Sequence, residues 1–188
     1  MVKYTLVGMC LLFAAATAHA QSIGEKSGVN SALGMSPSTQ DFVTEAAQGD
    51  MPEIETGKLA QQQASDPSVK QFGGQLVNDH QQTTNDLKAL VSGGKVRANL
   101  PTAMDSTHQG KLDKLKGLSG ADFDKAFDDL QTSVHKDATS LFERYSKGGE
   151  NADLKAFAAK YLPTLQHHLQ TAEDLSKNRT TTQGRGSR

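Results

Sequence analysis

The feature that most constrains the fold is the helical spacing of the apolar residues between Gln40 and Lys177. In this stretch apolar residues recur every three or four positions, whereas β-branched runs are few and Trp is absent from the chain. Such spacing is typical of amphipathic helices. The stretch covers roughly 140 residues, which is enough for one hydrophobic core and too little for two. We therefore predict a single all-α domain.

Capping and turn residues divide this domain into four long helices. The dipeptide Asp66-Pro67 combines a capping side chain with a proline suited to a first helical turn, and glycine pairs mark two helix ends. Pro52 and Pro163 fall inside predicted helices, where we expect kinks rather than ends. The predicted helices span about 38–65, 67–91, 120–147 and 151–177, with a short amphipathic segment at about 104–118.

The four helices form two similar hairpins. Val69-Lys70-Gln71-Phe72 opens the second helix, and Leu154-Lys155-Ala156-Phe157 opens the fourth in the same pattern. Two antiparallel hairpins joined by a long crossover that contains a short helix are typical of a ferritin-like four-helix bundle. We predict this bundle over residues 38–177, preceded by a flexible lead-in at 21–37 and followed by a disordered tail at 178–188.

The first twenty residues have the pattern of a secretory signal peptide. Lys3 precedes an apolar run, and Ala18-His19-Ala20 fits a cleavage site after Ala20. No second long apolar segment follows, so we predict a mature chain without a transmembrane helix. The expected location is the periplasm or the medium.

Cysteine usage and charge restrict the chemistry of the mature chain. The only cysteine, Cys10, lies in the predicted signal peptide, which leaves histidine and carboxylate as the strong metal ligands. Removal of Lys3 changes the balance of basic to acidic residues from 20 against 21 to 19 against 21. This balance argues against a nucleic-acid partner.

Three metal-competent side chains lie on the apolar faces of their helices. At about 100° per residue, His80 falls about 20° from the centre of its apolar stripe, and Glu53 and His168 fall within about 40° of theirs. His167 points away by more than about 90°, and His135 lies on the flank of its stripe. A buried ionisable group is costly unless it is paired or bound to an ion.

Depth along the bundle predicts that Glu53 faces His80, but it does not predict the same for His135 and His168. Glu53 lies 13 residues before Asp66 and His80 lies 14 after it, so the two should face each other within about 2 Å of axial offset. The same count from Gly149 places His135 and His168 about 7 Å apart in depth.

Two functional interpretations follow from these residues. The first is a transition-metal or proton-handling site formed by the inward residues Glu53, His80 and His168, with Zn or Cu as the ion best suited to imidazole and carboxylate. The second is a structural or envelope-stress interaction protein in which the same groups form a satisfied polar core. Asp79 and Asp137 are candidates to orient the histidine rings.

Several enzyme classes are disfavoured by missing motifs. A di-iron centre of the ferritin type needs Glu three residues before His on two helices, but Val77, Thr132 and Leu165 occupy those positions. No phosphate-binding loop and no nucleophile elbow is visible. We therefore expect a protein without catalytic turnover rather than an enzyme.

Residues 41–175 resemble the exported bacterial family DUF4142, which is placed with the ferritin-like bundles. The resemblance rests on motifs along nearly the whole mature domain, namely Phe42-Val43, Met51-Pro52-Glu53-Ile54-Glu55-Thr56-Gly57-Lys58-Leu59-Ala60, Val69-Lys70-Gln71-Phe72, Val77-Asn78-Asp79-His80, Phe123-Asp124-Lys125-Ala126-Phe127, Val134-His135 and Leu162-Pro163-Thr164-Leu165-Gln166-His167-His168-Leu169. It implies a ferritin-like fold and assigns Glu53, His80, His135 and His168 to the motif positions, which adds His135 to the candidate metal ligands. Pro52 and Val134 depart from the family pattern, and the second departure removes an expected carboxylate beside His135. The resemblance implies no particular activity.

Overall fold

The computed structural model describes residues 29–186, so the predicted signal peptide at 1–20 lies outside the described residues. Between residues 29 and 186 the chain is helical and forms no β-strand, apart from an isolated bridge between Ala64 and Gly120. Within this part, no helix is both long and apolar enough to cross a membrane. The helices are α2 (Val29–Ala32), α3 (Thr39–Gln63), α4 (Pro67–Ser92), α5 (Ser106–Lys116), α6 (Gly120–Gly148) and α7 (Ala152–Gly186).

Local capping explains where the long helices begin. The Ser38 hydroxyl oxygen accepts from the backbone N–H of Asp41 at the start of α3, and the Asp66 carboxylate accepts from that of Ser68 at the start of α4. Pro67 occupies the first position of α4, where a missing N–H costs nothing. Because these signals are local, the predicted starts of the four long helices agree with the structure to within about two residues.

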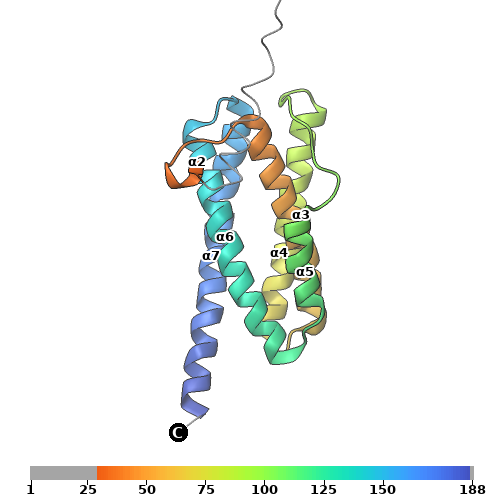
Figure 1. Cartoon of the computed structure of the whole chain (residues 1–188), viewed down its shortest axis with the longest axis vertical. Coiled ribbons are helices and arrows are strands. Elements are labelled where there is room, and N and C mark those ends of the chain that lie inside the picture. Colours follow the sequence, from red (N-terminus) through yellow and green to blue (C-terminus); the bar gives the residue numbers. More distant parts are fainter. Residues whose placement is uncertain (1–28, 187–188) are drawn as a thin grey trace, which may run out of the picture.

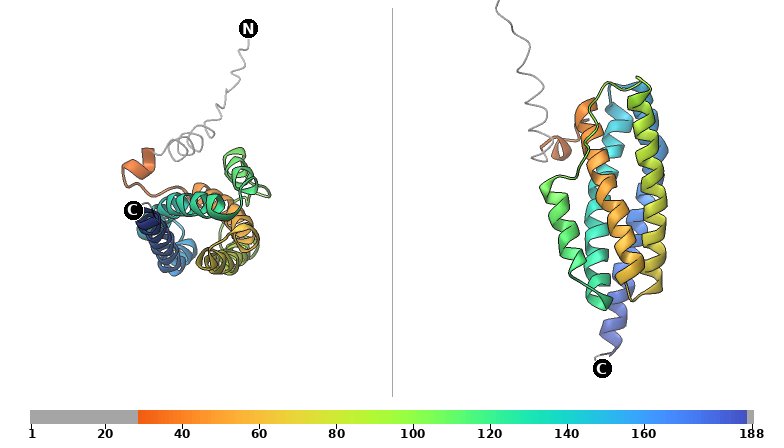
Figure 2. Two further views of the ribbon diagram at one scale, coloured as in Figure 1. Left: turned by 90° about the horizontal axis from the view of Figure 1, so that it is seen from below. Right: turned by 90° about the vertical axis from the view of Figure 1, so that its right-hand side faces the viewer.

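The four long helices form an antiparallel bundle (Figure 1). Helix α3 packs on α4 and α6 packs on α7, and further contacts join α3 to α6 and α4 to α7. Seen along its axis, the bundle is a square of four helices, with α5 lying outside it against α3 (Figure 2). The crossover from α4 to α6 contains α5, so the predicted four-helix bundle with a short helix in its crossover is confirmed.

The two helices of the first hairpin approach each other closely at two glycines. A Cβ atom on Gly57 would lie 2.5 Å from the carbonyl oxygen of Gly73, and one on Gly73 would lie 2.6 Å from the Cβ of Ala60. Only glycine fits at such a contact. The close approach brings Glu53 and Asp50, one and two turns before Gly57 on α3, within reach of α4.

The interior consists of two apolar clusters separated by a polar layer. The upper cluster is built around Phe42, whose ring stacks on Tyr145 with centroids 4.3 Å apart, and the lower cluster contains Phe72 and Phe127. Between them each long helix contributes buried polar side chains at the same depth. These are Asp50, Glu53, Thr56, His80, Thr83, Gln131, His135 and His168, and we call them the histidine layer.

Two segments differ in secondary structure from the expectation. The short helix α2 lies in the predicted lead-in, and α7 continues to Gly186 rather than ending near Lys177. Tertiary ion pairs support the extension as far as Arg179. The guanidinium of Arg179 donates to the Asp128 carboxylate at 2.7 and 2.9 Å and lies 3.6 Å from Asp124 and 3.8 Å from Asp66. These ion pairs attach the end of α7 to the lower end of the bundle.

Candidate metal centre

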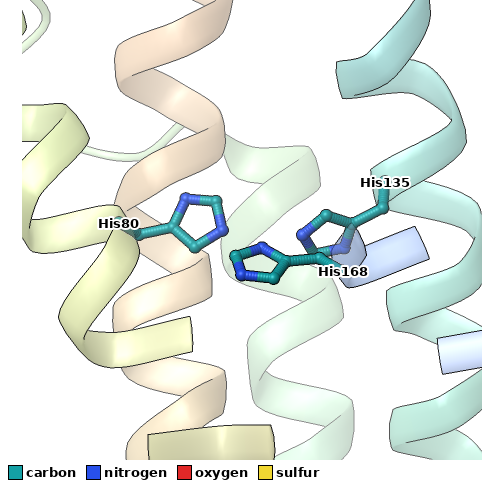
Figure 3. A group of neighbouring side chains, drawn as sticks. All are labelled: His80, His135 and His168. Atoms are coloured by element: carbon teal, nitrogen blue, oxygen red, sulfur yellow. The ribbon is translucent and has the colours of Figure 1, made fainter. Parts of the chain in front are cut away.

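Three histidine rings from three different helices meet in the histidine layer. His80 comes from α4, His135 from α6 and His168 from α7, and their side chains point toward one another (Figure 3). The ring centroids are 5.1 to 5.7 Å apart. One nitrogen of each ring lies within 4.8 Å of one nitrogen of each of the other two. Because a metal–nitrogen bond is about 2 Å long, nitrogens at this separation can share one ion after small side-chain adjustments.

Each ring is held by a hydrogen bond from the nitrogen that faces away from the centre. His80 Nδ1 lies 2.8 Å from Asp50 Oδ1, and His168 Nε2 lies 2.8 Å from Asp79 Oδ2. His135 Nδ1 lies 3.0 Å from the backbone carbonyl of Gln131. Since carboxylates and carbonyls only accept, the anchored nitrogen carries the proton in each neutral ring. The remaining nitrogen then presents a lone pair to the centre.

The three nitrogens that face the centre have no hydrogen-bond partner among the described residues. They are His80 Nε2, His135 Nε2 and His168 Nδ1, and Glu53 Oε2 in the same layer is also unpartnered. The four side chains are at most 5 % exposed. An unsatisfied buried polar atom costs about 1–3 kcal/mol. Among the described residues, these four atoms therefore do not pair with one another.

The predicted depth mismatch between His135 and His168 is wrong. Their ring centroids are 5.1 Å apart, closer than either is to His80. Helical side chains lean toward the N-terminus of their helix, and α6 and α7 are antiparallel, so the two side chains lean toward each other along the bundle axis. His135 is also 1 % exposed rather than on the flank of its helix, because both α3 and α7 pack against α6.

The predicted partnership of His80 with Glu53 is only partly correct. The two lie in the same layer, but His80 forms its hydrogen bond with Asp50, one turn earlier on α3. The Glu53 carboxylate is not among the groups whose atoms lie within 4.8 Å of one another. Sequence reasoning missed Asp50, although its spacing of three residues from Glu53 places both on one helix face.

The other candidate residues agree with the prediction only in part. Asp79 does orient a ring, but that of His168 across the bundle rather than that of its sequence neighbour His80. Asp137 is exposed on α6, and the hydrogen bond that anchors the His135 ring comes from a backbone carbonyl instead. His167 is exposed, as expected.

Burial and neighbouring charges give the three rings different pKa values. Burial and the nearby charges of His80 and His168 hold the pKa of His135 well below its usual value. Burial and the charge of His80 lower the pKa of His168 to about 4. Burial alone would lower the pKa of His80, but the hydrogen bond and charge of Asp50 raise it instead. Two of the three rings are thus neutral at pH 7, as a metal ligand must be.

A carboxyl group beside the rings is also perturbed by its surroundings. Burial raises the pKa of Glu53 to about 7, and the charge of His80 and a hydrogen bond from Gln131 oppose this only in part. The group is therefore divided between its neutral and charged forms near pH 7.

A cleft leads from the surface to this layer. It lies between α3, α5 and α6, has a volume of about 1000 Å³, and is lined at its inner end by Asp50, Glu53, His80 and His135. Its outer part includes exposed Asp137. The cleft therefore brings solvent close to the histidine layer, whereas the ring nitrogens that face the centre are themselves buried.

The fold and the histidine layer define a helical-bundle protein with a candidate metal centre. Residues 24–175 match the family described as a domain of unknown function, DUF4142, and the chain belongs to this family. A comparison with curated proteins found no match.

Two solved structures share the bundle. The structure of CopM in the Cu(II)-bound form is similar with a TM-score of 0.64 at 16% identity, over 77% of this chain and 99% of that one. A DUF305 protein from Streptomyces coelicolor that is thought to be secreted is similar with a TM-score of 0.62 at 13% identity, over 76% of this chain and 94% of that one. At these identities the likeness concerns the fold.

Proposed function

We propose that this protein binds one transition-metal ion, Cu(II) or Zn(II), through His80 Nε2, His135 Nε2 and His168 Nδ1. The observation that carries the proposal is the orientation of three buried rings, each anchored by one nitrogen and each turning an unpartnered nitrogen to a common centre. Carboxylate or carbonyl partners on the outer nitrogen are the usual support of metal-binding histidines.

The ligand chemistry favours copper or zinc among the available ions. Imidazole nitrogen suits Cu(II) and Zn(II), whereas Mg²⁺ and Ca²⁺ prefer oxygen ligands. For a given set of nitrogen ligands Cu(II) binds more tightly than Zn(II). The fold is also that of CopM, which was solved in a Cu(II)-bound form.

The proposed setting is outside the cytoplasm. The signal-peptide pattern ending at Ala20 supports export, and the DUF305 protein with the same fold is thought to be secreted. Export would expose the protein to periplasmic or external metal ions. We propose binding without catalytic turnover, because the sequence contains no complete catalytic motif.

Isothermal titration of the mature protein with Cu(II) and Zn(II) tests the proposal. We expect one ion per chain with a dissociation constant below about 1 μM, and loss of this site in His135→Leu. His167→Leu is the matched control, since it removes an exposed histidine next to His168 and should leave the affinity unchanged. Equal binding by native protein and His135→Leu, or no binding by either, would reject the site.

A further inference from the structure

The cleft between α3, α5 and α6 has an excess of negative charge. It is lined by five carboxyl groups, namely Glu45, Asp50, Glu53, Asp105 and Asp137. Lys111 and Arg144 are the two lysine or arginine side chains in its lining. A cleft lined mainly by one sign of charge concentrates ions of the opposite sign and raises their rate of association. This cleft is therefore suited to attract cations.

The acidic lining continues from the surface to the histidine layer. Asp137 is exposed in the outer part of the cleft, whereas Asp50 and Glu53 at its inner end are at most 5 % exposed. Glu53 Oε2 is buried in the cleft wall and has no hydrogen-bond partner among the described residues. A buried carboxylate oxygen without a donor is an acceptor that a cation can satisfy.

An ion bound by the ring nitrogens has to pass the protein that buries them. Along the bundle axis the layer lies between the two apolar clusters, which are costly for a charged ion to cross. On the side of the cleft, His80, His135 and Glu53 are themselves part of the lining. The last step requires one of these side chains to turn aside, and Glu53 can do so without breaking a hydrogen bond at Oε2.

We infer that this cleft is the route by which divalent cations reach the histidine layer, with Glu53 as the last carboxylate on the route. The inference rests on the proposed metal site. A group that acts on the ion only during its passage changes the rates of entry and exit by the same factor. The dissociation constant is the ratio of these rates, so it stays the same. Kinetics therefore separates the route from the site.

The cleft wall contains a position at which a large side chain can be added. Gly49 lines the cleft on α3, and a Cβ atom added there meets nothing within 4 Å. Gly110 on α5 also has open space around an added Cβ, but it is exposed and not part of the cleft lining. Gly49→Trp and Gly110→Trp are therefore matched variants that differ in whether the new side chain lies in the cleft wall.

Stopped-flow kinetics of the mature protein with Cu(II) tests the inference. Entry is followed by the imidazole-to-copper absorption after mixing with a Cu(II) salt, and exit by its loss in excess chelator. Gly49→Trp should slow entry and exit alike, each by about fivefold or more, and keep the dissociation constant within about threefold. Gly110→Trp should behave like the native protein.

The charge of the cleft is tested by a second pair of variants. Asp137→Asn removes an exposed carboxylate from the cleft lining, and Asp129→Asn removes one from the same helix outside it. We expect Asp137→Asn to slow entry by about twofold at low ionic strength and to weaken its dependence on salt, since salt screens exposed charges. Asp129→Asn should keep the native rate and the native salt dependence.

The possible failures of these experiments are distinguishable. If Gly49→Trp binds Cu(II) with native rates, the ion enters elsewhere and the inference is wrong, while the metal site stands. Slower entry without equally slower exit would indicate a damaged site rather than an obstructed route, and would also overturn the inference. The same holds if Asp137→Asn and Asp129→Asn have equal rates and equal salt dependence. If Cu(II) does not bind at the histidines, the proposed function fails first and the inference fails with it.

Discussion

The molecule buries two groups of polar side chains, and they differ in how their atoms are paired. At the lower end of the bundle, Arg179 is surrounded by Asp66, Asp124 and Asp128, and we call these four residues the Arg179 cluster. Asp124 also accepts hydrogen bonds from the backbone N–H groups of Ser65 and Asp66. In the histidine layer the outer ring nitrogens are paired, whereas the inner ones have no partner among the described residues.

The difference indicates what each group does. The Arg179 cluster provides its own counter-charge, and it joins the start of α4, the start of α6 and the end of α7. Only Asp128 Oδ1 lacks a partner within the cluster's described atoms, and burial raises the pKa of Asp128 to about 6. The histidine layer contains similar polar groups, but acceptor atoms that face its centre lack a partner among the described residues. One group stabilises the fold, and the other has the form of a binding site.

The largest effect on the metal-free fold is expected from the Arg179 cluster. Arg179→Ala leaves two carboxylates that are each 1 % exposed without their cation, and removing one partner of a buried ion pair costs about 3–5 kcal/mol. Because Arg179 itself is 15 % exposed, we expect a loss at the lower end of this range. Urea unfolding should show a free energy of unfolding lower by about 3 kcal/mol, with or without metal.

Lys125→Ala is the control for this loss. Lys125 pairs with Asp129 at an exposed position of α6, where solvent screens the pair, so its removal should leave the free energy of unfolding almost unchanged. Equal losses in Arg179→Ala and Lys125→Ala would show that the cluster does not stabilise the fold.

The stability of the metal-free protein should depend little on the histidine layer. His135→Leu removes an unpartnered buried nitrogen and leaves only a helical carbonyl behind, so the metal-free protein should keep its stability within about 1 kcal/mol. The free energy of unfolding of the native protein should rise by about 2.7 kcal/mol at a free ion concentration 100 times the dissociation constant. Thermal unfolding of His135→Leu, compared with and without Zn(II), should show no such rise. A metal-free variant destabilised as strongly as Arg179→Ala would contradict the contrast.

The carboxylate behind His80 should affect affinity more than stability. Asp50→Asn keeps an acceptor for the ring N–H but removes the charge, and changes to such supporting groups cost about 10–100-fold in metal affinity. Asp137→Asn removes an exposed carboxylate from the cleft and should leave the affinity unchanged. Competition titration with a chelator measures both, and equal effects of the two variants would refute a role for the Asp50–His80 pair.

The smallest expected effect is that of pH. Asp50 raises the pKa of His80, so below that pKa a proton occupies the nitrogen that the ion needs. Metal affinity should therefore fall as pH decreases through neutrality and rise with increasing pH, by at most about tenfold per pH unit for one displaced proton. Competition titrations at three pH values across this range measure the slope. An affinity that increases toward low pH would be incompatible with binding to His80.

The fold was predictable because its signals are local. Caps at Ser38 and Asp66 and glycines after the helices fix helix ends through contacts within a few residues. The end of α7 was not predictable, because the ion pairs of Arg179 reach residues on α4 and α6. Periodicity alone gives a residue's face, not its partners across the bundle.

The site was predictable in part for the same reason. His80 and His168 lie on their apolar stripes, and the structure buries both. Periodicity leaves His135 on a flank, and its burial depends on how α6 is rotated between its neighbours. The pairing of Asp50 with His80 depends on the close approach of α3 and α4 at Gly57 and Gly73. No spacing along one helix contains that information.

X-ray absorption spectroscopy of the Cu(II)-loaded mature protein tests the central claim most directly, because it identifies the atoms bound to the ion. Binding at the centre of the histidine layer predicts three imidazole nitrogens at about 2.0 Å and a further light-atom ligand. The same measurement on His135→Leu should lose this three-imidazole signature. A first shell with one imidazole or none, or one unchanged in His135→Leu, would contradict the claim.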